Sequence, residues 1–393
     1  MVQNLWCDLS NYFEDNSLEN SSKFLPTHKT DIVVTKPGVL NIGAGDMNSM
    51  NSCFAQSSDD GILFGLKSVK VKNTLVLNGG GGDKSLYHFG NITSNNLLIF
   101  NSIIQAQAMS SPILNINCNK RLFLQNSDIK PYNEALNVSG ILININLGGG
   151  NSAQIEVNDD PSFLNDTAPG AYFIDSTIYS GCSITAPSAL LTGSKNYGIL
   201  SAKTTLSQSS INYGTLTNKA QFENSSNEGI CFSETLFISN SNNSKQGQLY
   251  GNSIFSGTAS NNGLITSTTS FLSSSINNGI ISGALSTFSG SAINNSTIYS
   301  NCLFIDSSSN NGSVSGSVKF YKSNNTGRVI GNLYMISGQS NGTISGSCQF
   351  IASANNSNIN GQCIFSNSTN NGNVNGSANF SDQSINNGNI TKS

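Results

Sequence analysis

The sequence predicts an all-β fold, a β-solenoid in which short strands stack coil upon coil. Two observations predict it: a motif that recurs every 15 to 18 residues through the second half of the chain, and apolar residues at even offsets inside that motif. The composition agrees, because only 10% of the 393 residues are charged and 37% are hydrophobic, against about 25% and about 45–50% in an ordinary soluble domain. The core must therefore be thin and supplied at regular intervals along the chain.

The motif is clearest in residues 310–320, 340–350 and 370–380, which share the consensus Asn-Gly-x-Ile/Val-x-Gly-x-x-x-Phe. The first Gly of the motif serves as the anchor of each repeat. The anchors, two of them Ser, are Gly198, Gly214, Gly229, Gly247, Gly263, Gly279, Ser296, Gly312, Gly327, Gly342, Ser357, Gly372 and Gly388.

Apolar or small residues lie two, six and eight residues after the anchor. Even differences place side chains on one face of an extended chain, whereas a helix would need a period of 3.6. Two residues after the anchor are Leu200, Leu216, Leu249, Ile265, Ile281, Ile298, Val314, Val329, Ile344, Ile359, Val374 and Ile390. Six residues after it are Ala220, Cys302, Val318, Leu333, Cys348, Cys363 and Ala378. Eight residues after it are Leu206, Phe222, Phe237, Phe255, Phe271, Phe304, Phe320, Met335, Phe350, Phe365 and Phe380.

One repeat holds too few apolar residues to be stable alone, but stacked repeats pair their strands and join these residues into continuous columns. We expect two short strands and two turns per coil. Asn-Asn-Gly suits a corner, because Asn and Gly accept left-handed backbone geometry and Asn amides hydrogen-bond along a ladder. A second Gly, four residues after the anchor, marks a bend that needs positive φ or close backbone approach.

Upstream of these repeats the spacing widens. Two strand-like segments share an apolar, polar, Ser, apolar pattern, and we interpret the distance from Ser102 to Ser127 as one wide coil. The first predicted part of the chain, residues 1–30, is a cap or attachment arm. Residues 31–195 are predicted to form wide coils, each of about 25 residues, and residues 196–393 narrow coils, each of about 16 residues.

Charge and hydropathy argue against several kinds of protein. The net charge is −3, and no basic cluster is present that would displace counterions from a nucleic acid. No apolar run approaches the roughly 20 residues that span a bilayer, so we expect no membrane insertion. The N-terminus carries Asp8 where a signal peptide has Lys or Arg. We therefore expect a protein made in a cytoplasm, without a signal peptide.

The strands of the wide coils, such as residues 124–129, resemble those of the right-handed β-helices in pectate-lyase-like proteins and phage tailspikes. The narrow repeats resemble Asn-, Ser- and Gly-rich solenoid repeats in virion fibre or surface proteins of viruses with AT-rich genomes. Tailspikes and fibres are usually homotrimers that bind host-surface glycans. The resemblance therefore implies a right-handed β-helix whose partners are further copies of itself, other virion proteins and a host glycan.

We expect a structural virion protein without enzymatic activity: a spike, tail fibre, tailspike or capsid decoration subunit that acts as a rigid rod in assembly or host attachment. Two alternatives stay open. An adhesin or ice-binding solenoid would present regular Thr or Ser ladders, whereas the outward positions here mix Ser, Asn, Thr and Gly. A polysaccharide-degrading β-helix enzyme would use carboxylates, which are few in this chain.

The carboxylates that such an enzyme would draw on are Asp59, Asp60, Glu156, Asp159, Asp160, Asp166 and Asp175. We interpret them as solvated turn residues and expect no catalytic residue, cofactor or metal. The Gly-rich run at residues 78–85 has Asp83 where a phosphate loop has its final Gly, so we interpret it as a turn. His28 and His88 are too few and too far apart in sequence to indicate a zinc site.

The eight Cys, at positions 7, 53, 118, 182, 231, 302, 348 and 363, include no CxxC pair, and we interpret them as buried free thiols. Cys348 and Cys363 hold the same offset in consecutive coils. We expect them to stack as small core residues, with a soft-metal or redox role as the alternative. The sequons at Asn91, Asn137, Asn165, Asn224 and Asn295 are those that a chain rich in Asn and Ser contains by chance, and we expect them to stay unglycosylated.

Overall fold

The structure is a computed structural model, which describes residues 170–391 without a gap and, before them, strands β1 to β10 with the turn between β8 and β9. The predicted cap, residues 1–30, lies outside the described residues. Every element within them is a β-strand, and none is a helix that could cross a membrane. Contacts divide the chain into two compact units, Met1–Lys219 and Ala220–Ser393.

The first unit contains strands of very different lengths, nearly all paired in parallel. Leu63 pairs with Leu86 and Leu98 pairs with Phe123, one wide coil further on, whereas Ile184 pairs with Leu200, one narrow coil away. The strands are β1 Asp31–Val34, β2 Val39–Gly43, β3 Ser57–Ser58, β4 Gly61–Val71, β5 Thr74–Asn78, β6 Ser85–Phe100, β7 Ser102–Ala106, β8 Leu114–Gln125, β9 Asp128–Lys130, β10 Ile143–Leu147, β11 Gly170–Ile174, β12 Thr177–Ile178, β13 Cys182–Thr192, β14 Lys195–Asn196, β15 Ile199–Ser207, β16 Ile211–Asn212 and β17 Thr215–Leu216. The predicted β-solenoid is confirmed, with the long strands in the wide coils.

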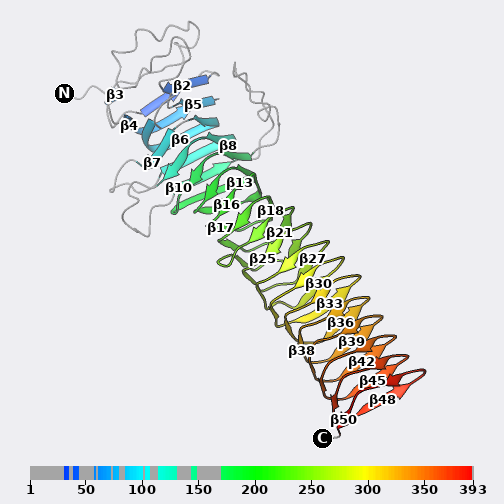
Figure 1. Ribbon diagram of the computed structural model, residues 1–393. Helices are drawn as coiled ribbons and strands as arrows, with labels where there is room; N and C mark the ends of the chain where they lie inside the picture. The colour runs from blue at the N-terminus through cyan, green and yellow to red at the C-terminus, as the bar shows by residue number, and fades with distance from the viewer. Residues whose placement is uncertain are drawn as a thin grey trace, which may run out of the picture. The chain divides into compact units, whose positions relative to one another are not determined.

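The second unit is a regular solenoid in which each coil has three short strands, and Figure 1 shows its strands from β18 to β50 as successive rungs. The first stack is β19 Ser226–Asn227, β22 Asn242–Asn243, β25 Ser260–Asn261, β28 Ile276–Asn277, β31 Ile293–Asn294, β34 Ser309–Asn310, β37 Asn324–Asn325, β40 Gln339–Ser340, β43 Ala354–Asn355, β46 Thr369–Asn370 and β49 Ile385–Asn386. The second stack is β20 Ile230–Cys231, β23 Gln248–Leu249, β26 Leu264–Ile265, β29 Ile280–Ile281, β32 Thr297–Ile298, β35 Ser313–Ser315, β38 Arg328–Ile330, β41 Ile344–Ser345, β44 Ile359–Asn360, β47 Val374–Asn375 and β50 Ile390–Thr391. The third stack is β18 Ala220–Glu223, β21 Thr235–Ile238, β24 Ser253–Phe255, β27 Thr269–Phe271, β30 Leu285–Phe288, β33 Asn301–Ile305, β36 Val318–Tyr321, β39 Leu333–Ile336, β42 Cys348–Ile351, β45 Cys363–Ser366 and β48 Ala378–Ser381.

The expectation of two strands and two turns per coil is therefore wrong. The additional strand is the first stack, whose second residue is almost always an Asn two residues before the anchor. That Asn is buried in nearly every coil, so a polar residue occupies an inward position. The pattern of apolar residues does not reveal this strand, because its buried residue is an amide.

A column of Phe rings fills the side of the core that lies against the third stack. Rings in successive coils from Phe222 to Phe320 stack with centroids 4.5 to 4.8 Å apart. Met335 interrupts the column, and Phe350, Phe365 and Phe380 continue it. Full burial of each ring contributes about 1.5–3 kcal/mol of transfer free energy.

One member of this column was missing from the sequence prediction. Counting eight residues from Gly279 leads to Thr287, but the structure pairs Phe271 with Phe288 and Phe288 with Phe304. A coil with one extra residue accounts for the shift, and the ring still enters the core. The anchor spacing alone therefore misses a residue that the register recovers.

The second column consists of aliphatic side chains from the second stack. From Leu249 to Val374 its members are fully buried, and Cys231 precedes them in the same column. The predicted ladder residues Ile298, Val314, Val329, Ile344, Ile359 and Val374 are all here, and the predicted ladder Phe residues up to Phe365 are buried in the Phe column. Phe380, in the last of these coils, is only partly covered.

The two kinds of corner use different backbone geometry. The Asn-Asn-Gly corner at the anchor is not left-handed, contrary to expectation. The left-handed non-Gly residues, such as Asn224, Asp306, Lys322 and Asp382, follow the third stack instead. Of the Gly residues four after the anchor, the four from Gly331 to Gly376 have positive φ, for example 144° at Gly376. At Gly283 and Gly316 the expected close backbone approach applies instead, because a Cβ there would clash with the carbonyl oxygens of Ser267 and Ser300.

Candidate interaction face and side-chain ladders

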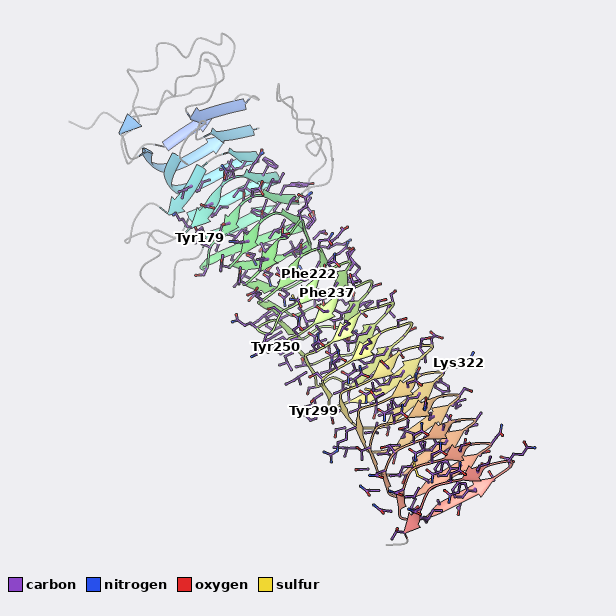
Figure 2. The ribbon with its side chains drawn as sticks, viewed as in Figure 1. Tyr179, Phe222, Phe237, Tyr250, Tyr299 and Lys322 are labelled. Carbon is purple, nitrogen blue, oxygen red and sulfur yellow. A yellow bond between two sulfur atoms is a disulfide. The ribbon has the colours of Figure 1, made fainter. Side chains whose placement is uncertain are left out.

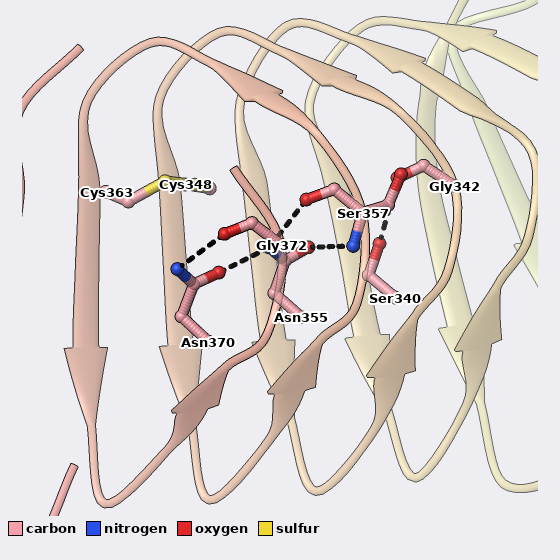
Figure 3. Close-up of a disulfide and its surroundings, with 8 residues drawn as sticks. All are labelled: Ser340, Gly342, Cys348, Asn355, Ser357, Cys363, Asn370 and Gly372. Atoms are coloured by element: carbon pink, nitrogen blue, oxygen red, sulfur yellow. Dashed lines mark hydrogen bonds between the residues drawn. A yellow bond between two sulfur atoms is a disulfide. The ribbon is translucent and has the colours of Figure 1, made fainter. Parts of the chain in front are cut away.

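The most regular polar feature of the second unit is a ladder of buried Asn side chains from the first stack. Each side chain donates from Nδ2 to Oδ1 of the next coil at 2.7 to 2.8 Å. Its second N–H bonds a nearby backbone carbonyl, as Asn370 does to Gly372 and Asn355 does to Ser357 (Figure 3). A buried amide left without these partners would cost about 1–3 kcal/mol. The buried ladder consists of Asn227, Asn243, Asn261, Asn277, Asn294, Asn310, Asn325, Asn355 and Asn370, with Ser340 in place of one Asn.

The sequence prediction placed Asn amides in a corner ladder and did not assign a buried column to them. The signal was present, because Asn recurs two residues before the anchor in almost every repeat. A polar residue that recurs at this offset, an even number of residues before the buried aliphatic position, indicates an inward side chain.

A second, exposed ladder runs beside the buried one, using the Asn directly before the anchor. Here the later coil donates to the earlier one: Asn371 donates to Asn356 at 2.8 Å and Asn387 donates to Asn371 at 2.9 Å. The buried ladder runs the other way, from Asn355 to Asn370 at 2.7 Å. The amide dipoles of the two ladders therefore oppose one another.

Cys348 and Cys363 form a disulfide between β42 and β45, with Cα atoms 4.6 Å apart (Figure 3). This corrects the interpretation of the pair as free thiols or soft-metal ligands. The physical reason is register: parallel in-register neighbours that both point inward have Cα atoms within the roughly 4.4–6.8 Å range of a disulfide.

The other described thiols, Cys182, Cys231 and Cys302, are free and buried. Burial raises the pKa of Cys302 to about 12, because the thiolate would lose its hydration, and Ser300 and Ser286 oppose this in part. Burial likewise raises the pKa values of Cys182 and Cys231. No cluster of His, Cys, Asp and Glu that could hold a metal occurs among the described residues.

Apart from Cys348 and Cys363, the part of the chain that the structure describes brings no two of the predicted chemical candidates together. Asp175 is the one candidate carboxylate among the described residues, and it occupies a turn with φ of 46° after β11. The other carboxylates, His28, the interior of the Gly-rich run, and the sequons at Asn137 and Asn165 lie outside the described residues. Asn224 occupies a left-handed corner, and Asn295 belongs to the exposed ladder.

The outward side of the second stack carries more of the exposed large apolar side chains of the second unit than either of the other two stacks. We define the apolar face as the outward side of β20 to β38, with Phe232, Tyr250, Ile280, Tyr299 and Ile330 exposed. Phe232 and Tyr250 stack at 5.3 Å, and Leu264 pairs in register with Ile280. Figure 2 shows Tyr250 and Tyr299 on one side of the unit, opposite Lys322.

Further along the same stack, and at the corner that precedes it, the outward residues change to amides. We define the amide face as the exposed Asn356, Asn358, Asn360, Asn371, Asn373, Asn375, Asn387 and Asn389. Amides in consecutive coils bond one another, as Asn375 does to Asn360 at 2.9 Å and Asn373 does to Asn358 at 3.3 Å. The amide face is uncharged, and its amides repeat both along each coil and from coil to coil.

Comparison with known proteins provides no assignment: no family model, curated protein or solved structure matches this chain.

Proposed function

We propose that this protein is a structural component of a viral particle, a spike, fibre or decoration subunit whose C-terminal unit acts as a stiff column in assembly or host-surface attachment. It is made in the host cytoplasm, resides on the virion and has no enzymatic role. The observation that carries the proposal is the stacking of three columns, Phe, aliphatic and Asn, through the second unit, with Met335 and Ser340 as single substitutions in the Phe and Asn columns. Bending such a column would separate rings and amides in many coils at once.

We assign the apolar face to contacts with further copies of the chain. From β20 to β38 it extends over six coil steps, about 29 Å at about 4.8 Å per step. Strands of two or three residues make it about 10 Å wide at about 3.3 Å per residue, so it offers about 290 Å². It would therefore be the apolar centre of an interface whose polar rim completes the roughly 600 Å² per partner of the smaller specific interfaces. Arg328 is the one charged residue at its outward positions. Flat sheets pack face to face about 10 Å apart, so three copies with this face toward a common axis would cover it.

The test is the mass of the protein in solution, by light scattering after size exclusion, together with negative-stain images. A trimeric rod is expected. The triple variant Tyr250→Ser, Ile280→Ser, Tyr299→Ser should be a monomer, because it removes the apolar surface without touching the core. The control Ile254→Ser, Ile364→Ser changes residues of similar exposure (43% and 46%) on the third stack and should remain a trimer. A parent protein that stays monodisperse and monomeric at high concentration contradicts the proposal.

The amide face favours the adhesin or ice-binding alternative, since a regular array of hydrogen-bonding groups can contact an ordered surface. Thermal hysteresis of the parent protein, abolished by Asn358→Ala and Asn373→Ala together, would support it. Freezing behaviour equal to that of an unrelated protein at the same concentration would dismiss it.

A further inference from the structure

The second unit contains eight Asn-Gly pairs, the sequence most prone to spontaneous loss of the Asn amide. In an open chain the backbone nitrogen of Gly, unshielded because Gly has no Cβ, attacks Cγ of the preceding Asn. The new N–C bond closes a succinimide ring and ammonia leaves. Water then opens the ring to Asp or isoaspartate. The eight Asn residues are Asn262, Asn278, Asn311, Asn341, Asn360, Asn371, Asn375 and Asn387.

The structure holds the electrophile of this reaction in place. Asn278 donates to Asn262 at 3.2 Å and accepts from Asn295 at 3.0 Å. Asn371 donates to Asn356 and accepts from Asn387 in the same manner. To reach the following nitrogen, Cγ would have to leave the ladder and break both bonds.

The nucleophile, the backbone nitrogen of the following Gly, is also hydrogen-bonded in the structure. The N–H of Gly312 donates to the carbonyl of Asn294 at 3.0 Å, and the N–H of Gly376 donates to the carbonyl of Thr391 at 2.8 Å. The N–H of Gly263 instead donates to the buried amide oxygen of Asn261 at 3.2 Å. Further Gly of these pairs whose N–H is bonded are Gly279, Gly342 and Gly361. A hydrogen-bonded and rigid N–H is a poorer source of the attacking nitrogen.

We propose that the ladders keep these Asn-Gly pairs unreactive while the coils are closed, so that they become modification sites only when a coil opens. Conversion of the Asn to Asp or isoaspartate would then keep the coil open. An Asp cannot donate where the amide did, carboxylates in neighbouring coils would repel one another at about 4.8 Å, and isoaspartate adds a backbone atom that shifts the register. The ladders thus protect the column chemically as well as stabilising it, whatever surface the protein serves.

The first test compares the folded protein with the same protein in urea at mildly alkaline pH, with peptide mapping by mass spectrometry over time. Conversion at Asn278, Asn311 and Asn371 should be at least about tenfold slower in the folded protein, because the reactive geometry requires local opening. Equal rates in both states would overturn the proposal.

The second test removes one ladder bond. The hydroxyl of Thr326 donates to Oδ1 of Asn311 at 2.6 Å and also contacts the carbonyl of Asn310 at 3.2 Å. In Thr326→Val, conversion at Asn311 should rise several-fold while Asn278 in the same molecule stays slow. Thr287→Val, on the third stack, is the control and should change neither rate. If Thr326→Val leaves Asn311 as slow as in the parent, the ladder is not the protecting element. If that variant fails to fold, the comparison of folded and urea-treated parent protein still decides.

Discussion

The apolar face and the amide face lie along one strand stack, yet only their outward residues differ. Beneath both, the inward side is the same aliphatic column, from Leu249 under the first to Val374 under the second. On the outward side, the apolar face has residues such as Tyr250 and Ile280, whereas the amide face has Asn360 and Asn375. Because successive residues of a strand point to opposite sides, the core and the surface are specified independently. The same column can therefore present an association surface in one segment and a hydrogen-bonding lattice in the next.

The largest expected effect tests whether the core beneath the two faces is equivalent. Phe350→Asp, in the Phe column next to the amide-face coils, buries a carboxylate between Met335 and Phe365 and should cost about 4–5 kcal/mol or more. Phe271→Asp, in the Phe column of the apolar-face coils, should cost as much. Thermal unfolding followed by circular dichroism measures both, with the exposed Asn379→Asp as the control. A Phe350→Asp protein that melts like the parent would show that the Phe column is not the core.

The next effect separates the two segments, because the disulfide lies in the coils of the amide face. A disulfide that closes a loop of 15 residues contributes about 3 kcal/mol. Reductant should lower the urea midpoint of the parent by the corresponding amount. The double variant Cys348→Ser, Cys363→Ser should not respond to reductant, and a response equal to that of the parent would assign the effect elsewhere.

A smaller effect distinguishes the two ladders. Asn277→Ala removes the ladder bond that Asn261 donates and the ladder bond that Asn294 accepts, both inside the core, and should cost about 2 kcal/mol. Its neighbour Asn278→Ala removes an exposed amide whose partners can bond water, and should cost less than about 0.5 kcal/mol. Chemical unfolding of the two variants provides the comparison. Equal losses of unfolding free energy would mean that burial does not determine how much an Asn side chain contributes to the stability of this fold.

The effect that is smallest at neutral pH, and grows only in alkali, concerns Cys302, in the same column as the disulfide but separated from it by Val318 and Leu333. Its pKa rises from 9.0 to about 12 on folding, so the unfolded thiol ionises first as pH increases. Stability should therefore fall between pH 9 and 12, by at most about 1.4 kcal/mol per pH unit. Melting temperatures of the parent and Cys302→Ala across this range measure the share of Cys302. If the melting temperature of the parent falls less steeply with pH than that of Cys302→Ala, the burial of the Cys302 thiol is not the cause.

Much of the fold follows from the repeat alone. Each inward position tolerates only a side chain that can be buried in a narrow core, so the aliphatic residues and nearly all the Phe recur at fixed offsets. The exceptions have separate causes. Phe288 follows an extra residue, and the buried Asn of the first stack satisfies its polar groups only through the coils on either side.

The candidate interaction face was far less predictable. Phe232, Tyr250 and Ile280 lie at outward positions, where no burial requirement makes the residue type recur. Their shared location follows from the register of coils whose lengths differ. The disulfide could not be predicted from the sequence either, because equal offsets indicate that two Cys stack but not that their sulfur atoms face each other.

The sequence by itself determined the period, the β-solenoid and the residues that form its columns, since burial in a thin core imposes the same demand on every coil. The tertiary structure decided the third strand, the inward Asn ladder, the Cys348–Cys363 bond and the division of one outward side into an apolar and an amide face. These features depend on which atoms of neighbouring coils meet, and that is fixed only when the coils are closed and in register.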